Sequence, residues 1–249
     1  MSDWNAASVQ VVWFSADAHG LDASDLFATM AGAPAISTNH NSAPTPANPR
    51  FSSASGELNG VAFEIGVQFG RIDFVVQRPA SDGQIVPELF ADTPALLTDT
   101  IVKVKRLTGT VPSVNRLALV LQLGNFAGSH PKCTQLVNQS IGNAVDYEGI
   151  SDLMLQVNRR FKATDTTELE MNRLLRFSVL QIQQVFLDAA RATMAGTQEL
   201  FMASFMVDLN TVPTTRAIDV AEQNRIWDTL AAEALRLRDV GSIEGLGEQ

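Results

Sequence analysis

The clearest pattern in the chain is a strict alternation of apolar and polar positions between residues 61 and 76. Large apolar residues occupy every second position in two runs, 61–69 and 72–76, and Gly70-Arg71 separates the runs. Successive side chains of a strand point to opposite faces of a sheet, so this alternation is typical of half-buried strands. The pattern therefore predicts a β-hairpin.

Further strands are predicted at 8–14, which is rich in β-branched and aromatic residues, and at 153–161, which alternates again. The run 117–123 has leucine at alternate positions with mostly apolar residues between them, so we expect a strand that is covered on both faces. The segment 172–187 fits helical spacing about as well as strand spacing. We favour a strand there, because a second strand-like run at 199–209 follows after a short connection.

Helical spacing of apolar residues occurs in segments that begin at capping residues and end at glycine. The predicted helices start at Asp22, Asp92 or Thr93, Pro131 and Asp219, and they end at Gly32, Gly109, Gly142 and Gly241. The last helix has the strongest signals, because Asp219 and Glu222 form a capping box and an apolar stripe follows. That amphipathic helix needs a sheet or a partner to cover its apolar side.

Between Ala33 and Gly56 the chain holds four of its ten prolines among small polar residues. Ile36 and Phe51 are the only large apolar residues in this stretch. The composition predicts a long loop near the N-terminus, and such loops are either functional or mobile.

The order of predicted elements favours an α+β fold, in which a mostly antiparallel sheet packs on helices, over a doubly wound parallel fold. The long N-terminal loop and the C-terminal amphipathic helix complete this expectation. We expect a single domain over residues 1–249. Each half ends in a helix after a set of strands, so two apposed subdomains, 1–145 and 146–249, are the alternative.

The net charge of the chain disfavours two classes of function, the binding of nucleic acids and of anionic membranes. The chain of 249 residues has a net charge of −9, with 8 basic and 13 acidic residues in 1–150 and 10 and 14 in 151–249. A chain that is acidic throughout lacks the broad positive surface that nucleic acids and anionic membranes attract. There is no apolar run of membrane-spanning length and no signal-peptide pattern after Met1. With a single cysteine, Cys133, we expect an acidic protein of the reducing cytoplasm, without disulfides.

The segment 117–141 is the most suggestive local feature for ligand binding. A predicted strand leads through Gly124, Gly128 and Ser129 into a predicted helix, and the free N–H groups at a helix N-terminus can bind a phosphate. The segment lacks the Gly-Lys-Ser/Thr ending of a P-loop, and Pro131 removes one N–H donor. An ordinary connecting turn is the alternative.

The one local excess of positive charge lies at 158–176, with five basic and three acidic residues. If its two strands pair, Arg160 and Arg176 share a face of the sheet and can receive an acidic ligand or partner. The candidate ligand-binding residues of this segment are Asn158, Arg160, Arg173 and Arg176. The alternative is that these basic side chains pair with Asp165, Glu168 and Glu170.

Two further clusters have simpler structural explanations. His130 and Cys133 have the spacing for a thiol nucleophile, but a lone cysteine is more often a buried hydrophobe. Asp17, His19 and Asp22 are too few for a transition-metal site without distant ligands. We expect no metal and no cofactor, and the chain contains none of the common hydrolase, metalloprotease or dinucleotide motifs.

The absence of catalytic motifs and the long loop favour a non-catalytic binding or assembly protein, acting as subunit or adaptor of a multi-protein complex. We expect a protein partner or a homo-oligomer, contacted through sheet faces, the 33–56 segment and the C-terminal helix. The alternative is a binder of an anionic small molecule, or an enzyme whose site is built from scattered residues. Nucleic-acid binding ranks third.

Overall fold

The computed structural model describes residues 4–79, 88–146, 148–162, 169–188 and 193–247; for 184–188 and 193–197 it describes the backbone alone. The described chain forms one sheet of nine strands and four α-helices. The strands are β1 (Asn5–Ser15), β2 (Ser37–His40), β3 (Arg50–Leu58), β4 (Val61–Gln68), β5 (Arg71–Gln77), β6 (Val114–Asn125), β7 (Met154–Lys162), β8 (Glu170–Asp188) and β9 (Thr193–Thr211). The α-helices are α1 (Ala23–Ala31), α2 (Thr93–Leu107), α3 (His130–Ser140) and α4 (Val220–Val240), and short 3-10 turns lie at Ala18–Gly20 and Ile243–Leu246.

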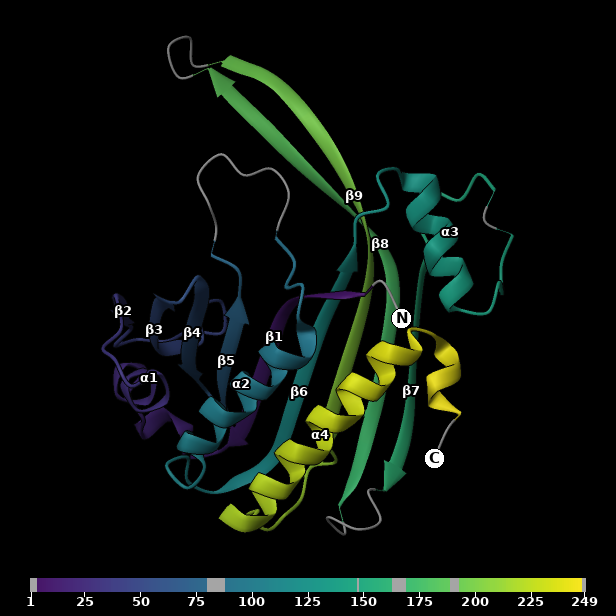
Figure 1. Ribbon diagram of the computed structural model, residues 1–249. Coiled ribbons are helices and arrows are strands. Elements are labelled where there is room, and N and C mark those ends of the chain that lie inside the picture. The colour runs from purple at the N-terminus through teal and green to yellow at the C-terminus, as the bar shows by residue number, and fades with distance from the viewer. Residues whose placement is uncertain (1–3, 80–87, 147, 163–168, 189–192, 248–249) are drawn as a thin grey trace.

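All neighbouring strands are antiparallel, in the order β2-β3-β4-β5-β1-β6-β9-β8-β7 (Figure 1). This confirms the α+β class and the hairpin predicted at 61–76. The sheet continues through both halves of the chain, because β6 pairs with β9. The segment 172–187 is a strand, as favoured.

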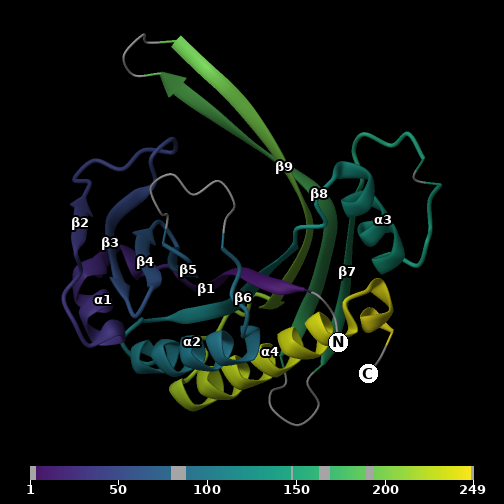
Figure 2. The ribbon, with the colours of Figure 1, turned by 45° about the horizontal axis from the view of Figure 1, so that its top comes forward.

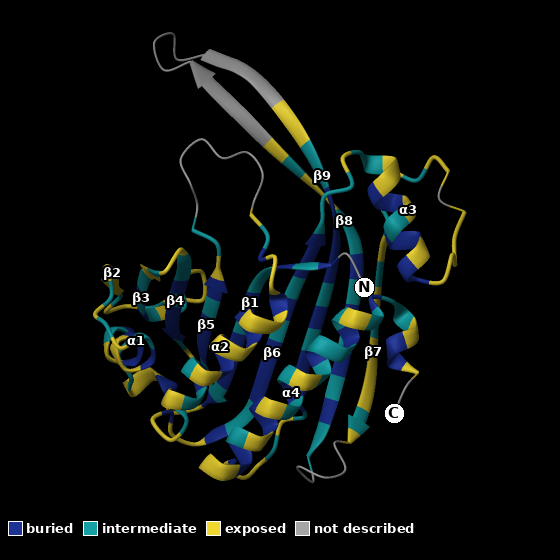
Figure 3. Cartoon of the chain, in the orientation of Figure 1, coloured by how far each residue is buried: buried dark blue, intermediate teal, exposed yellow. Residues whose placement is uncertain are grey.

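The helices pack on one face of the sheet. Helix α1 covers β3 and β4, α2 covers β1, α4 covers β6 and β9, and α3 lies against β8 and β9. Alternate residues of the central strands point into this layer and are buried, as Figure 3 shows for the strands beneath α2 and α4. Trp13 of β1 meets Trp227 of α4 edge to face, with ring centroids 5.4 Å apart. The C-terminal amphipathic helix therefore finds its cover in the sheet.

The predicted helix starts hold in atomic detail. The carboxylates of Asp22, Asp92 and Asp219 each accept a hydrogen bond from a backbone N–H of the first helical turn. Helices α1 and α4 end at Gly32 and Gly241, which adopt the left-handed conformation with φ of 71° and 64°. Glycine adopts it without the steric cost that a Cβ brings.

The prediction of a long loop over 33–56 is wrong in part. Strand β2 and most of β3 lie within this range and form one edge of the sheet, while the prolines fall outside both strands. Helix α1 packs on β3, and the residues that β3 buries there are small: Ser52 and Ala54 are buried although neither is large. The hydrophobic pattern that reveals central strands is therefore missing here.

The expectation for 117–123 is also corrected. Leu117, Leu119, Leu121 and Leu123 of β6 are fully buried against the helices. On the other face, Ala118 is buried, but Val120 and Gln122 are only half-buried, and in the described part of the chain no helix covers them. Within those same residues, no helix combines the length and apolar composition needed to cross a membrane.

Candidate functional site

The face of the sheet opposite the helices is the first candidate surface, and we call it the open face. The strand registers align its side chains in rows that run across the strands. One such row is Ser53, Gly66, Asp73, Val12, Ala118, Asn210, Asn172 and Arg160, from β3 to β7. Most of these residues are polar, in contrast to the helix-covered face.

Asp73 is the centre of a hydrogen-bond network on the open face. Its carboxylate accepts bonds from Gln10 Nε2 at 2.7 Å, Gln68 Nε2 at 2.7 Å and Arg71 Nε at 2.9 Å, and Arg71 Nη2 bonds to its second oxygen. The carboxylate is nearly buried, so these charge-assisted bonds offset its loss of water. The network ties β1, β4 and β5 together and leaves Asp73 little capacity for a ligand.

A second network crosses the other half of the open face. Asn210 accepts hydrogen bonds from Arg116 Nη2 at 3.0 Å and from Asn172 Nδ2 at 2.9 Å, and its own Nδ2 donates to Asp208 at 2.8 Å. Asn158 Nδ2 reaches Asn172 at 3.4 Å. The predicted candidate Asn158 therefore belongs to a chain of amides across β9, β8 and β7, which the Arg116 guanidinium continues on β6.

Arg160 and Arg176 lie on the same face, because Arg160 stands opposite Asn172 and Arg176 opposite Gln156. Four residues along β8 separate these two positions, which is roughly 13 Å. Arg160 approaches Glu170 at 3.5 Å, which is the alternative pairing considered above. Arg176 is half-buried, and within the described ranges it forms no ion pair. The two arginines thus share a surface without converging on one point.

Arg173 lies on the other face. It is 7% exposed, its Nε is 2.5 Å from Glu233 Oε1 on α4, and its guanidinium stacks 3.9 Å from the Phe161 ring. Burial lowers the pKa of Arg173, and the Glu233 carboxylate works against that shift. Arg173 and Arg176 are three residues apart, and this spacing places them on opposite faces of a strand. The structure does not bring Arg173 together with Arg160 and Arg176.

Gly124, Gly128 and Ser129 do not gather into one site either. Gly124 lies on the open face of β6, where an added Cβ would come 2.5 Å from Met202 Sδ, so a methionine covers its backbone. Gly128 has φ of 84° in the connecting turn. Ser129 is the N-cap of α3, and its hydroxyl makes no capping bond. Since α3 lies on the helix-covered face, the turn leads away from Gly124.

A cavity of about 880 Å³ lies beside α3. Its lining comes from α3, the following connection and the base of the β8–β9 pair: His130, Pro131, Thr134, Asp146, Glu148, Gly149, Ile150, Ser151, Gln181 and Phe201. His130 Nε2 is 2.9 Å from the Ser151 carbonyl oxygen, and its ring packs on Phe201. Asp146 and Glu148 make the lining acidic, which disfavours a phosphate at the start of α3.

Cys133 lies in α3 and is fully buried, in agreement with its interpretation as a packing residue. Asp22 caps α1 and lies 3.6 Å from His40. Among the residues that the structure describes, no three His, Cys, Asp or Glu side chains form a group able to hold a metal ion.

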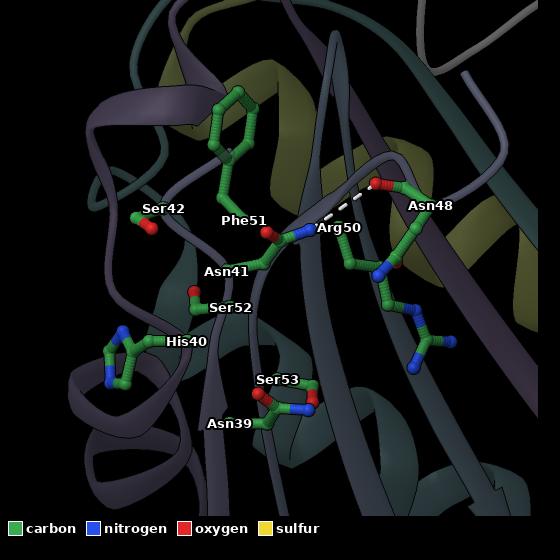
Figure 4. A pocket seen from close by; sticks show the side chains of 9 residues that line it. All are labelled: Asn39, His40, Asn41, Ser42, Asn48, Arg50, Phe51, Ser52 and Ser53. Atoms are coloured by element: carbon green, nitrogen blue, oxygen red, sulfur yellow. Dashed lines mark hydrogen bonds between the residues drawn. The ribbon is translucent and has the colours of Figure 1, made fainter. Parts of the chain in front are cut away.

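The 33–56 segment forms a second cavity, of about 480 Å³, at the β2–β3 edge (Figure 4). Amide and hydroxyl side chains supply most of its lining, which consists of Asn39, His40, Asn41, Ser42, Asn48, Arg50, Phe51, Ser52 and Ser53. Asn41 Nδ2 donates to the Asn48 carbonyl oxygen at 3.4 Å, as the dashed line in Figure 4 marks. Arg50 is paired with Glu64. The cavity is polar, and the Asn41 amide and the Arg50 guanidinium of its lining already have partners within the chain.

The feature that sequence reasoning missed is the length of the β8–β9 pair. Strand β7 ends its pairing with β8 at Ser178, and β6 ends its pairing with β9 at Ala203. Beyond these points, residues 179–188 and 193–202 pair with each other and with no further named strand of the described chain. We call this two-stranded extension the ribbon; about ten residues per strand span roughly 30 Å. Figures 1 and 2 show the ribbon projecting from the body, away from α2 and α4.

These features define an α+β protein with one antiparallel nine-stranded sheet, helices on one face, a preorganised polar open face and a projecting ribbon. Comparisons of the chain with known protein families, with curated proteins and with solved structures find no match.

Proposed function

We propose that this protein is a non-catalytic binding or assembly protein, acting as subunit or adaptor of a multi-protein complex, and that it contacts its partner through the ribbon and the adjoining open face. The observation that carries this proposal is the ribbon. Apart from Val179 and Phe201 at its base, no side chain that the structure describes in the ribbon packs in the core between sheet and helices, yet the ribbon extends the two longest strands well beyond their neighbours.

The ribbon is poorly supported by the protein itself. An isolated two-stranded hairpin is marginally stable in water, and a third strand or a packed face is normally needed. Helix α3 supports only its base, through the contact of His130 with Phe201. Leu180 is 40% exposed on the ribbon, and Ile182 and Leu200 are half-buried. A partner that covers these side chains removes their apolar surface from water, and this burial stabilises the complex.

The open face suits the same role. Its networks around Asp73 and Asn210 hold polar side chains in fixed positions, so a partner meets a surface that loses little entropy on binding. A mixture of polar groups with partly exposed apolar residues such as Val75 and Val120 is typical of non-obligate interfaces. The acidity of the chain favours a protein partner over nucleic acid. The single cysteine suits the cytoplasm as the place of assembly.

The test is a ribbon-shortened variant in which Asn-Gly replaces residues 181–201. Leu180 and Met202 stand opposite each other, so a two-residue turn closes the hairpin there. In lysate of the natural host, the tagged wild-type chain of 26.9 kDa should elute in a larger complex. The variant should elute as a monomer that keeps the helical circular dichroism bands of the wild type. A wild-type monomer, or a complex that the shortening leaves intact, would contradict the proposal.

Arg176 motivates the second candidate function, the binding of an anionic small molecule. Its guanidinium is half-buried on the open face, and no carboxylate of the described residues pairs with it. Thermal-shift measurements with nucleotides and sugar phosphates test this candidate. Stabilisation of the wild type that Arg176→Ala abolishes would support it, and the absence of any stabilisation would count against it.

A further inference from the structure

We propose that the outer edge of β8 in the ribbon, at residues 179–183, receives an extended strand of a partner protein, and that this strand places a lysine or arginine side chain in the cavity beside α3. This inference rests on the proposed function and specifies the partner: a basic segment that binds by strand addition. Main-chain hydrogen bonds supply affinity in this binding mode, and pockets for alternate side chains supply specificity.

The edges of the sheet differ in how they are protected against pairing with another strand. Open strand edges invite unwanted pairing, and proteins protect them with charges, proline or short length. The β7 edge carries Arg159, Arg160 and Lys162, and β2 is only four residues long. The ribbon edge has no such protection, because Val179 to Gln183 reads VLQIQ and the sequence stays free of charge, proline and glycine through Leu187. An edge that is left open where others are protected is suited to pairing.

The backbone N–H and C=O groups of alternate residues at the ribbon edge point outward, away from β9. The Val179 N–H donates to the Leu153 carbonyl oxygen at 3.4 Å, so it points away from β9. Groups of an antiparallel strand alternate in direction, and Gln181 and Gln183 therefore also direct their N–H and C=O groups outward. Ile182, between them, bonds toward β9. An added strand would lie beside β8 next to the end of β7, where it can form hydrogen bonds with the outward groups of Gln181 and Gln183.

The cavity beside α3 adjoins this edge and has an acidic lining. Gln181 lines it from β8, so every second side chain of an added strand lies on the cavity side. Asp146 and Glu148 are the carboxylates of the lining, and among the described residues neither forms an ion pair. A lysine or arginine can pass its apolar stem along Phe201 and bring its charge to these carboxylates.

A second copy of this chain fits the edge less well. Self-pairing of the ribbons would bring the VLQIQ segment to the cavity, and that segment has no basic residue. A net charge of −9 on each copy also opposes their approach. The charges of the cavity and of the whole chain favour a basic partner.

The test uses a phage-displayed library of random decapeptides, selected on the full-length protein and counter-selected on the ribbon-shortened variant. Enriched peptides are synthesised, and their Kd is measured by fluorescence anisotropy. We expect alternating β-forming residues around one lysine or arginine.

Three variants locate the binding. Gln181→Pro combined with Gln183→Pro removes two outward N–H groups without breaking bonds to β9, and it should raise Kd at least tenfold. Glu199→Pro is the matched control, because Glu199 stands opposite Gln183 and its N–H points to the other edge; Kd should stay within twofold. Asp146→Asn combined with Glu148→Gln should raise Kd at least fivefold, and replacing the peptide's basic residue by glutamine should add little in that variant.

Several results would overturn the proposal: no enriched peptide, peptides that bind the double-proline variant as well as wild type, or binding that ignores the loss of both carboxylates. Self-association of the wild type that the double-proline variant abolishes would assign the edge to a second copy instead. If the ribbon-shortened variant loses its complex while the double-proline variant keeps it, strand addition is wrong and the proposed function still stands.

Discussion

Removal of the Glu233 carboxylate should destabilise the fold more than the loss of any surface charge. Arg173 is 7% exposed and Glu233 11%, and their side chains meet at 2.5 Å between β8 and α4. Glu233→Ala leaves the Arg173 guanidinium buried without its carboxylate. Breaking a buried ion pair from one side typically costs about 3–5 kcal/mol, because the remaining charge has neither water nor partner. Arg236 also loses this partner, but it is 31% exposed and keeps its bond to the Gly245 carbonyl oxygen.

The assay is urea unfolding followed by circular dichroism, with the free energy of unfolding taken from the midpoint and slope. Asp99→Ala is the control, because it breaks the exposed i,i+4 pair with Lys103 and should cost only about 0.3–0.5 kcal/mol. Arg173→Met combined with Glu233→Leu removes both charges and should recover most of the loss. A loss below about 1 kcal/mol for Glu233→Ala, or a double variant as unstable as the sum of the single ones, would refute this reasoning.

Three further substitutions test the fold in the same unfolding assay. Gly124→Ala should cost about 1–3 kcal/mol, because the new Cβ forces Met202 to move, and Met202→Ala should relieve part of this cost; equal stability with wild type would contradict the close contact. Asp73→Ala should cost about 1–3 kcal/mol, since it leaves its half-buried donors Gln10 and Gln68 without their acceptor. Asp219→Ala removes the cap of α4 and should cost about 1 kcal/mol; no change would show that the cap bond is dispensable.

The parts of the fold that the sequence predicts are those with local signals. The hairpin at 61–76 shows in alternation, and the starts of α1, α2 and α4 show in their capping aspartates, because each signal lies within a few residues of its effect. Strands β2 and β3 escape prediction, since an edge built from serine, threonine and alanine carries no hydrophobic pattern.

The candidate surface depends on contacts that are distant in sequence. Gln10 and Asp73 are 63 residues apart, and no local sequence pattern around either residue predicts their hydrogen bond. The separation of Arg173 from Arg176 follows from strand geometry once 172–187 is known to be a strand rather than a helix. The sequence does contain one indication of the ribbon. The uncharged run from Val179 to Leu187 continues beyond Ser178, where the pairing with the short strand predicted at 153–161 ends.

Hydrogen–deuterium exchange of the isolated protein and of its complex from the natural host tests the central claim most directly. The account predicts that backbone amides of Gln181 and Gln183, which point outward from the ribbon, exchange quickly in the free protein and become protected in the complex. Protection confined to the exposed surface of α4 or to the β2–β3 edge, with unchanged exchange in the ribbon, would contradict it.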